Sequence, residues 1–209
     1  MMQVYSALYN DSAHLNKFGK CNVVYHPDDL TNSNSILILH GGEDISPSIY
    51  GHSTSKRTHA DSSPSSRDEA EIDLAKEAIK KGIPIFGICR GAQLVCALAG
   101  GTLVQHVDNH VGGHHSVRTT DDEILSTTTC HHQMMNPWEV DHEMLAWSAP
   151  SLGSMYIVEG EQNINMKLEP EVVLFPKIKA LAVQGHPEWM QHRDPFVQYC
   201  LNLIEEKLL

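Results

Sequence analysis

The sequence predicts an α/β protein in which helices cover a largely parallel sheet. Short aliphatic runs at residues 36–39, 84–88 and 102–105 are typical of buried strands. Helical patterns fill the two intervals between these runs, so strands and helices alternate over residues 36–105. This alternation favours a parallel sheet, because each return to a parallel strand needs a crossover connection, usually a helix.

Two helices have recognisable terminal signals. Ser66, followed three residues later by Glu69, has the pattern of a capping box, in which side chains satisfy the free amides of a helix start. Gly82 indicates where the same helix ends. Near the end of the chain, Asp194 is a candidate cap and Pro195 suits the first helical position, which predicts a final helix from this point.

The rest of the chain is less regular. Residues 155–158, 172–175 and 180–184 have the composition of strands, and their short connections predict that several of them are antiparallel. Before the strand expected at residues 23–25, little of an opening strand–helix unit is visible. No internal repeat or linker divides the sequence, so we expect one domain over residues 1–209.

The composition excludes several classes of function. There are 26 acidic and 15 basic residues, giving a formal charge of −11, whereas a nucleic-acid-binding surface usually brings a basic excess. No apolar run approaches the ~18 residues of a membrane span, and no basic region followed by an apolar stretch marks a secretory signal. The five cysteines include no CxxC pair, which predicts a reducing cytoplasm rather than a disulfide framework.

One cysteine lies where a buried strand gives way directly to a buried helix. Cys89 has Gly87 and Gly91 two residues away on either side, which is the G-x-nucleophile-x-G spacing of a nucleophile elbow. In such a turn the helix N-terminus favours the thiolate, and the amide of Arg90 becomes a candidate oxyanion donor. The alternative is a buried structural cysteine, which is how we interpret Cys96 in the same helix.

A thiol nucleophile needs a base and an orienting group, and a candidate pair follows the strand at residues 180–184. His186 and Glu188 are two residues apart, so in extended backbone both side chains leave on the same side. With 14 histidines in the chain, a surface or core histidine is the alternative. The glycine turn Gly41–Gly42 also follows a strand and could supply a second oxyanion donor, or it is an ordinary tight turn.

Five stretches together resemble the class I glutamine amidotransferases, and most closely their peptidase C26 branch, the γ-glutamyl hydrolases. The matched stretches are LHGGEDISPSIYG (39–51), RDEAE (67–71), GIPIFGICRGAQLVCALAGGTLVQHV (82–107), HHQ (131–133) and PEVVLFPKIKALAVQGHPEW (170–189). The resemblance implies a flavodoxin-like three-layer sandwich with a central, mostly parallel sheet and a small antiparallel portion.

The resemblance also implies a Cys-His-Glu triad. By motif, Cys89 corresponds to the nucleophile, His186 to the general base and acid, and Glu188 to its orienting carboxylate. Gly42 and the amide of Arg90 correspond to the oxyanion hole. The implied reaction is attack on a γ-glutamyl carbonyl, release of the amine and hydrolysis of a γ-glutamyl thioester, with no cofactor.

Two further residues are assigned to substrate binding by the same resemblance. Gln93 corresponds to a residue that holds the backbone end of the γ-glutamyl group, and His131 is expected beside the same pocket. His40 stands where the branch usually has proline, and Cys130 where an aromatic residue is frequent. These departures concern recognition of the leaving group.

The histidines at positions 106–115 form a cluster in the sequence. We expect no metal site there, because Gly112 and Gly113 predict a flexible loop and no cysteine or carboxylate completes a known ligand pattern. His115 falls where the family has a histidine before a short strand, which indicates a structural role.

Three functions remain open at this level. The first is a free-standing hydrolase of γ-glutamyl amides, with ammonia, a polyamine, an amino acid or a polyglutamyl tail as leaving group. The second is a glutaminase subunit that delivers ammonia to a separate synthetase. The third is a non-catalytic binding module, which the presence of all three triad residues disfavours.

Overall fold

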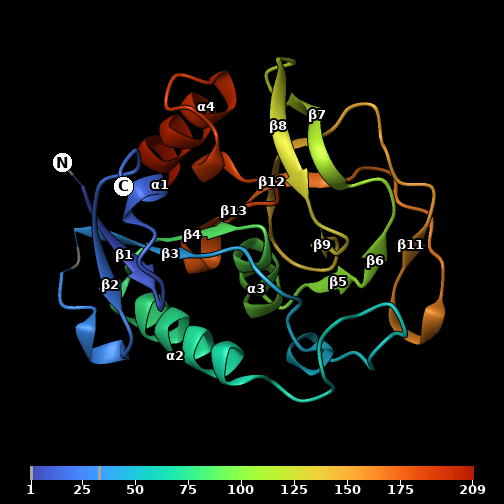
Figure 1. Cartoon of the computed structure of the whole chain (residues 1–209), viewed down its shortest axis with the longest axis horizontal. Helices are drawn as coiled ribbons and strands as arrows, with labels where there is room; N and C mark the ends of the chain where they lie inside the picture. Colours follow the sequence, from blue (N-terminus) through green and yellow to red (C-terminus); the bar gives the residue numbers. More distant parts are fainter. Residues whose placement is uncertain (1, 33) are drawn as a thin grey trace.

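A nine-stranded sheet runs through the computed structural model, which describes residues 2–32 and 34–209 (Figure 1). In spatial order its strands are β2 (Lys20–Val24), β1 (Gln3–Ala7), β3 (Ser35–Leu39), β4 (Ile85–Ile88), β13 (Ala180–Val183), β12 (Pro170–Phe175), β10 (Glu143–Ser148), β7 (Val111–Thr119) and β8 (Ile124–Cys130). The first five are parallel, and those from β12 onwards pair antiparallel. The prediction of a largely parallel centre with an antiparallel portion is confirmed.

Helices cover both faces of this sheet, which makes three layers. Residues of α2 (Ser66–Lys81) and α3 (Arg90–Leu98) share one apolar core with Leu37, Leu39 and Ile85. Residues of α1 (Ser12–Leu15) and α4 (Pro195–Leu203) share the other core with Ile36 and Ile38. Neighbouring residues of β3 therefore point to opposite cores, as the period of two in a strand requires. Figure 1 shows α2 and α4 on opposite sides of the sheet.

The start of the chain differs from the expectation of little visible structure. β1 lies between β2 and β3 inside the parallel half, and α1 follows it. Ser6 is fully buried in β1 and interrupts the apolar pattern, so a sequence reading underestimates this strand. The opening strand–helix unit is thus present, and we correct the prediction.

The capping box of α2 is present one residue earlier than predicted. The Ser65 hydroxyl accepts a hydrogen bond from the Asp68 amide (3.1 Å), and the Asp68 carboxylate accepts one from the Ser65 amide (2.9 Å). Ser66 and Glu69 are therefore the first turn of the helix rather than its cap. The C-terminal stop is confirmed at Gly82, which has the left-handed φ of +68°.

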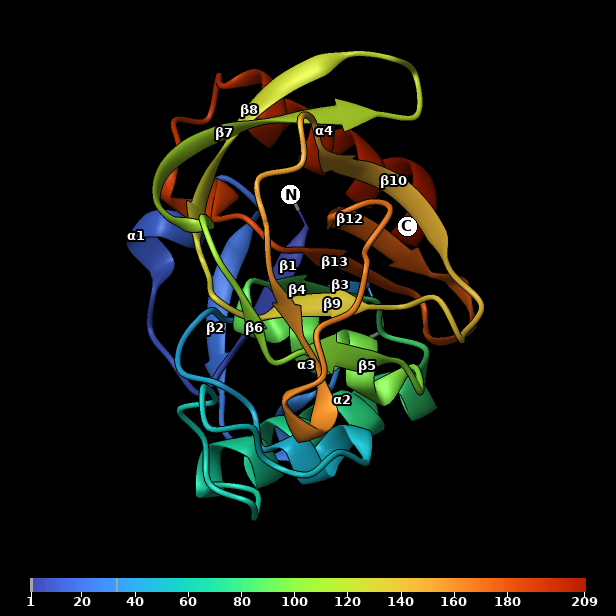
Figure 2. The same ribbon diagram turned by 90° about the vertical axis from the view of Figure 1, so that its right-hand side faces the viewer.

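The run at residues 102–105 forms a strand outside the main sheet. β5 (Thr102–Val104) pairs antiparallel with β9 (Met134–Asn136), and β6 (His106–Val107) pairs with β11 (Tyr156–Ile157) (Figure 2). β4 already has β3 on one side and β13 on the other, so it offers no free edge to the following strand. The strand expected at residues 102–105 is therefore present, but it does not belong to the central parallel sheet.

The remaining regular structure consists of short 3₁₀ turns and a terminal π-helical turn. These are η1 (Pro27–Asp29), η2 (Pro47–Tyr50), η3 (Glu159–Glu161), η4 (Pro176–Ile178), η5 (Pro187–Trp189) and the π turn η6 (Ile204–Leu208). Among the helices in residues 2–32 and 34–209, none combines the length and hydropathy of a membrane span.

Candidate active site

Cys89 lies at the junction of β4 and α3 in a strained backbone conformation. Its φ and ψ are 51° and −107°, a region that side-chain-bearing residues rarely adopt. A Cβ atom on Gly87 would lie 2.5 Å from the Gly91 carbonyl oxygen, and one on Gly91 would lie 2.2 Å from the Leu39 carbonyl oxygen. The turn therefore closes only with glycine at both positions, and the predicted elbow geometry is confirmed.

The Cys89 thiol is held in its protonated form at rest. Burial raises its pKa to about 12, the nearby Glu188 carboxylate acts in the same direction, and the Arg90 amide only partly opposes them. The helix N-terminus was expected to favour the thiolate, but the pKa of the Cys89 thiol is raised because desolvation outweighs the effect of the helix end. Ionisation of the sulfur therefore requires transfer of its proton to a neighbouring base.

His186 follows β13, and contacts on several sides fix its ring. Its Nδ1 lies 2.6 Å from Glu188 Oε1, and its ring stacks on the Trp189 indole with centroids 3.6 Å apart and an interplanar angle of 1°. The His186 amide donates to Thr128 Oγ1 (2.9 Å), whose hydroxyl donates back to the His186 carbonyl oxygen (3.2 Å). These contacts restrict the imidazole to one orientation.

The loop that carries His186 is also held from the start of the chain. Lys17 Nζ donates to the carbonyl oxygens of Pro187 (3.2 Å), Glu188 (2.8 Å) and Met190. One ammonium group thus bonds three carbonyl oxygens within four residues of the loop, which fixes the backbone that presents Glu188.

Cys89 and His186 are neighbours across Gly41. A Cβ atom on Gly41 would lie 2.6 Å from His186 Cε1 and 3.5 Å from Cys89 Cβ, so both side chains border the same small space. These residues are far apart in the sequence, but one follows β4 and the other follows β13, and they meet here because the two strands are parallel neighbours. The carboxyl ends of parallel strands are where α/β folds place their sites.

The Arg67 side chain packs against the Gly41–Gly42 turn and holds it in place. Its guanidinium donates to the carbonyl oxygens of Gly41 (2.9 Å) and His40 (3.3 Å) and to Glu71 (3.0 Å). A Cβ atom on Gly42 would lie 2.1 Å from Arg67 Nη1, so the guanidinium packs directly against the glycine. With its carbonyl oxygens held on this side, the turn is fixed in one conformation.

A second arginine connects this support to the elbow. The Arg90 guanidinium is fully buried and bonds Asp68 and Glu71 of α2, while the Arg90 amide lies beside the Cys89 sulfur. Glu71 thus links Arg67 beneath the glycine turn to Arg90 at the elbow. From the sequence, only the amide of Arg90 was expected to act and RDEAE had no assigned role, although the i, i+4 spacing places Arg67 and Glu71 on one helix face.

A cavity of about 530 Å³ opens over these groups. It is lined by Tyr9, Asn10, Asp11, His40, Gly41, Gly42, Arg67, Cys89, Cys130, His186, Glu188 and Trp189. Residues 9–11 after β1 were not identified from the sequence, because the opening unit is short and its pattern is interrupted. Trp189 was quoted in the sequence only as the end of a motif, without a role.

The two residues predicted to bind substrate occupy buried positions beside this cavity. Gln93 Nε2 donates to the Gln133 carbonyl oxygen (3.1 Å), and His131 Nδ1 lies 2.9 Å from that same oxygen. Neither side chain is among the lining residues in the described part of the chain, whereas Cys130 next to His131 is. A direct substrate contact of Gln93 or His131 stays a prediction.

The fold and the site define a class of α/β proteins with a cysteine elbow, a following His-x-Glu and a glycine turn at the carboxyl ends of a parallel sheet. A family model for peptidase C26 matches residues 28–188, and the chain belongs to this family of class I glutamine amidotransferase-like proteins. Protein NtpR of Enterococcus hirae is 33% identical over 73% of this chain and 66% of its own length. The carbamoyl phosphate synthase small chain of Salmonella typhi is 32% identical over 58% of this chain.

The chain spans less than two thirds of these curated relatives, 66% of NtpR and 29% of the carbamoyl phosphate synthase small chain. Among solved structures, a glutamine amidotransferase of Thermotoga maritima has a TM-score of 0.56 and 16% identity, covering 99% of this chain and 85% of its own. PurLQS of the same organism has a TM-score of 0.58 and 14% identity, covering 90% and 88%. These structures confirm the flavodoxin-like fold.

Proposed function

We propose that the protein hydrolyses a γ-glutamyl amide through a γ-glutamyl thioester on Cys89. The observation that carries the proposal is the His186–Glu188 pair, with 2.6 Å between Nδ1 and Oε1, placed next to a strained elbow cysteine. A nucleophile, a base and a group that orients the base are the three parts that acyl transfer requires. All three border one cavity.

The proposed reaction begins when the Cys89 thiol gives its proton to His186. Because Glu188 binds the Nδ1 side of the imidazole, Nε2 is left with a lone pair that accepts the Cys89 proton as the sulfur attacks the γ-carbonyl. The carbonyl oxygen gains negative charge, which the amides of Arg90 and Gly42 stabilise. His186 then gives its proton to the departing amine. The same residue next removes a proton from water, which attacks the thioester and releases glutamate.

The cavity wall also offers complementary charges for a glutamyl group. Such a group carries an α-carboxylate and an α-ammonium, and the wall contains one guanidinium, Arg67, and a carboxylate, Asp11, outside the triad. We assign the α-carboxylate to the side of Arg67 and the α-ammonium to the side of Asp11. The leaving amine then extends toward the open part of the cavity.

Measurement of glutamate release from a panel of γ-glutamyl amides, with free glutamine included, tests the proposal. Cys89→Ala is expected to lose all measurable release, because Cys130, which also lines the cavity, lies at the end of β8 and not at the elbow. Cys96→Ala is the matched control: it removes a thiol from the same helix, inside the core, and should keep activity. Full activity in Cys89→Ala would refute the proposal.

A second candidate function is a glutaminase subunit that passes ammonia to a separate synthetase. The relative in Salmonella typhi is named as the small chain of carbamoyl phosphate synthase, which favours this alternative. In that case the isolated protein should release little glutamate from glutamine, and a co-purifying synthetase should raise the rate. High activity of the isolated chain on a larger γ-glutamyl amide would exclude it.

A further inference from the structure

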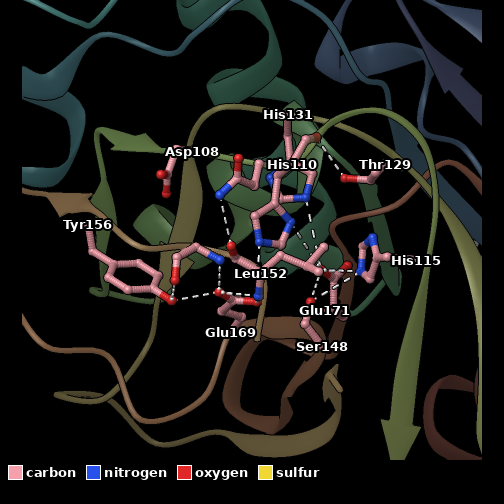
Figure 3. A network of polar contacts seen from close by, with 12 residues as sticks. Asp108, His110, His115, Thr129, His131, Ser148, Leu152, Tyr156, Glu169 and Glu171 are labelled. Atoms are coloured by element: carbon pink, nitrogen blue, oxygen red, sulfur yellow. Dashed lines mark hydrogen bonds and ion pairs between the residues drawn. The ribbon is translucent and has the colours of Figure 1, made fainter. Parts of the chain in front are cut away.

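A buried cluster of histidines and carboxylates lies next to the active site but belongs to no step proposed above (Figure 3). We call it the buried histidine cluster, and its members are His110, His115, His131, Glu169 and Glu171. None is more than 8% exposed, and both carboxylates are completely buried. The sequence analysis placed the early histidines in a flexible loop, yet His115 lies in β7 and the carboxylates arrive from β12 and the residue before it.

Three imidazole nitrogens converge on one carboxylate oxygen, Glu171 Oε1. His115 Nε2 lies 2.9 Å from it, and His110 Nδ1 and His131 Nε2 each lie 3.9 Å from it. The Ser148 hydroxyl also donates to this oxygen (3.0 Å). Ligands about 2.0–2.2 Å from a tetrahedral zinc ion are about 3.3–3.5 Å apart. The ligand atoms of His110, His115 and Glu171 lie within 4.8 Å of one another, so these groups would close in to hold an ion.

The second nitrogens of two rings lie near acceptor oxygens. His131 Nδ1 lies 2.9 Å from the Gln133 carbonyl oxygen in a hydrogen bond, and His110 Nε2 lies 3.2 Å from Glu169 Oε2 without hydrogen-bond geometry. Metal-bound histidines almost always direct their second nitrogen to a backbone carbonyl or a carboxylate, which fixes the ring for coordination. Glu169 is itself held by the Leu152 amide (2.9 Å), the Gly153 amide (2.7 Å) and the Tyr156 hydroxyl (2.6 Å).

Several buried atoms of the cluster lack partners. His131 Nε2, both ring nitrogens of His110, His115 Nδ1 and Glu171 Oε2 are buried and make no hydrogen bond. Because His131 presents Nδ1–H to a carbonyl oxygen, its Nε2 carries a lone pair in the neutral ring, and this lone pair faces an acceptor oxygen. Two acceptors facing each other in a dry interior require a cation or a donor between them. A divalent ion would also balance the two buried carboxylates, whereas proton sharing is the competing explanation.

We propose that the buried histidine cluster is a structural site for a divalent transition metal of the zinc class. The ligands would be His110, His115 and Glu171, whose ligand atoms lie within 4.8 Å of one another and form a nitrogen-rich set that suits zinc rather than magnesium or calcium. His131 Nε2, 3.9 Å from Glu171 Oε1, would move closer to become the fourth ligand. Four protein ligands leave no open position, so the metal would stabilise the fold rather than activate water. It would tie β7, β12 and the segment after β8 together behind the cavity wall at Cys130.

A second group of side chains could also bind a metal ion, so a test must show which of the two groups holds it. Asp44, His59 and His132 also bring ligand atoms within 4.8 Å of one another, but this group is partly exposed. None of its imidazole nitrogens is among the buried atoms without a partner. It therefore carries no proposal and serves as the control.

The test is the metal content of tag-free protein expressed with added zinc, purified and dialysed against a weak chelator. We expect about one zinc per chain in the wild type and in the double variant His59→Ala/His132→Ala. Glu171→Gln and His110→Ala should lose it. A wild type without metal would overturn the proposal, and so would zinc that disappears from the His59→Ala/His132→Ala variant while His110→Ala retains it.

Because a buried variant can fail to fold, unaltered protein gives an independent answer. Wild-type protein is unfolded in denaturant that contains a strong chelator, freed of both, and refolded with or without zinc. The Tm of each sample is then measured. The zinc-refolded sample should melt at least about 4 °C higher, and the same shift should appear in His59→Ala/His132→Ala. Equal Tm values for the two samples would contradict the proposal. This outcome is independent of whether Cys89 hydrolyses γ-glutamyl amides.

Discussion

At the scale of single residues, the geometry of the candidate site depends on three glycines as much as on the residues with reactive side chains. Gly41 separates His186 from Cys89, and Gly87 and Gly91 let the elbow close. Cys89, His186 and Glu188 could be chosen from the sequence as one candidate site, because elbow and His-x-Glu patterns are local, and their catalytic roles stay predictions. The protonated state of the thiol could not be predicted, because it depends on burial by residues distant in the chain.

Gly41→Ala tests this arrangement. The added Cβ would lie 2.6 Å from His186 Cε1, so the imidazole must shift, and a displacement on the order of 1 Å is expected to lower kcat/KM about 100-fold. Gly51→Ala is the control, since a Cβ there meets no atom within 4 Å, although its φ of +76° brings backbone strain. Steady-state kinetics measures kcat/KM of the two variants, and thermal melts measure their loss of stability. Unchanged kcat/KM in Gly41→Ala would mean that the ring is not positioned as described.

His40 makes stability sensitive to acid. Burial lowers its pKa from 6.5 to about 4, the Arg67 charge acts in the same direction, and Asp11 opposes them. The unfolded chain therefore binds a proton more readily between these values, so this stability is present above pH 6.5 and lost as the pH falls toward 4. The difference amounts to about 3 kcal/mol.

His40→Gln isolates this contribution. Denaturant unfolding at pH 7 and pH 4 should show that wild type loses about 3 kcal/mol more than the variant over this range. Ser6 Oγ, which lies 2.7 Å from His40 Nε2, keeps a polar partner in the glutamine variant. Parallel pH profiles for the two proteins would show that His40 does not take up a proton on unfolding.

At the scale of elements, α2 is the support of the active site as well as a covering helix. Its first turns carry Arg67, Asp68 and Glu71, which hold the glycine turn and the start of α3. The helix itself could be predicted from its periodicity and end signals, with a cap displaced by one residue. Its role could not, since the partners of these charges are 19 to 27 residues away.

Arg67→Lys tests the supporting role. A lysine keeps the charge but cannot bond the Gly41 and His40 carbonyl oxygens and Glu71 at once. We expect kcat/KM to fall roughly 10- to 100-fold while the protein stays folded, because the oxyanion turn loses its fixed geometry. Arg57→Lys, in an exposed loop, is the matched control and should behave as wild type. Equal kinetics in both variants would assign Arg67 no part in positioning the turn.

At the scale of the whole molecule, strands with continuous aliphatic runs could be predicted from local sequence, whereas β1 and the β7–β8 hairpin could not. Strands β3, β4 and β13 were expected close to where they lie, because their aliphatic runs and flanking turns are visible in the sequence. The β7–β8 hairpin begins with Gly112 and Gly113 and alternates buried with exposed residues only later, so its first part has the composition of a loop. Burial of His110 against Glu169 results from sheet pairing between distant segments, and no local pattern indicates it.

The loop that carries His186 is held by residues that are distant in the sequence. Lys17 Nζ donates to the Glu188 carbonyl oxygen, and Thr128 Oγ1 of β8 accepts from the His186 amide. The candidate site therefore combines segments from the first strand–helix unit, the antiparallel half and the loop after β13.

The most direct test of the central claim is covalent labelling with a glutamine-analogue electrophile, followed by peptide mapping. One equivalent should attach to Cys89, free glutamine should slow the labelling, and His186→Ala should label far more slowly because the thiol is protonated at rest. Labelling of Cys130 in place of Cys89, or labelling at an equal rate without the imidazole, would contradict a site built from this cysteine and this base.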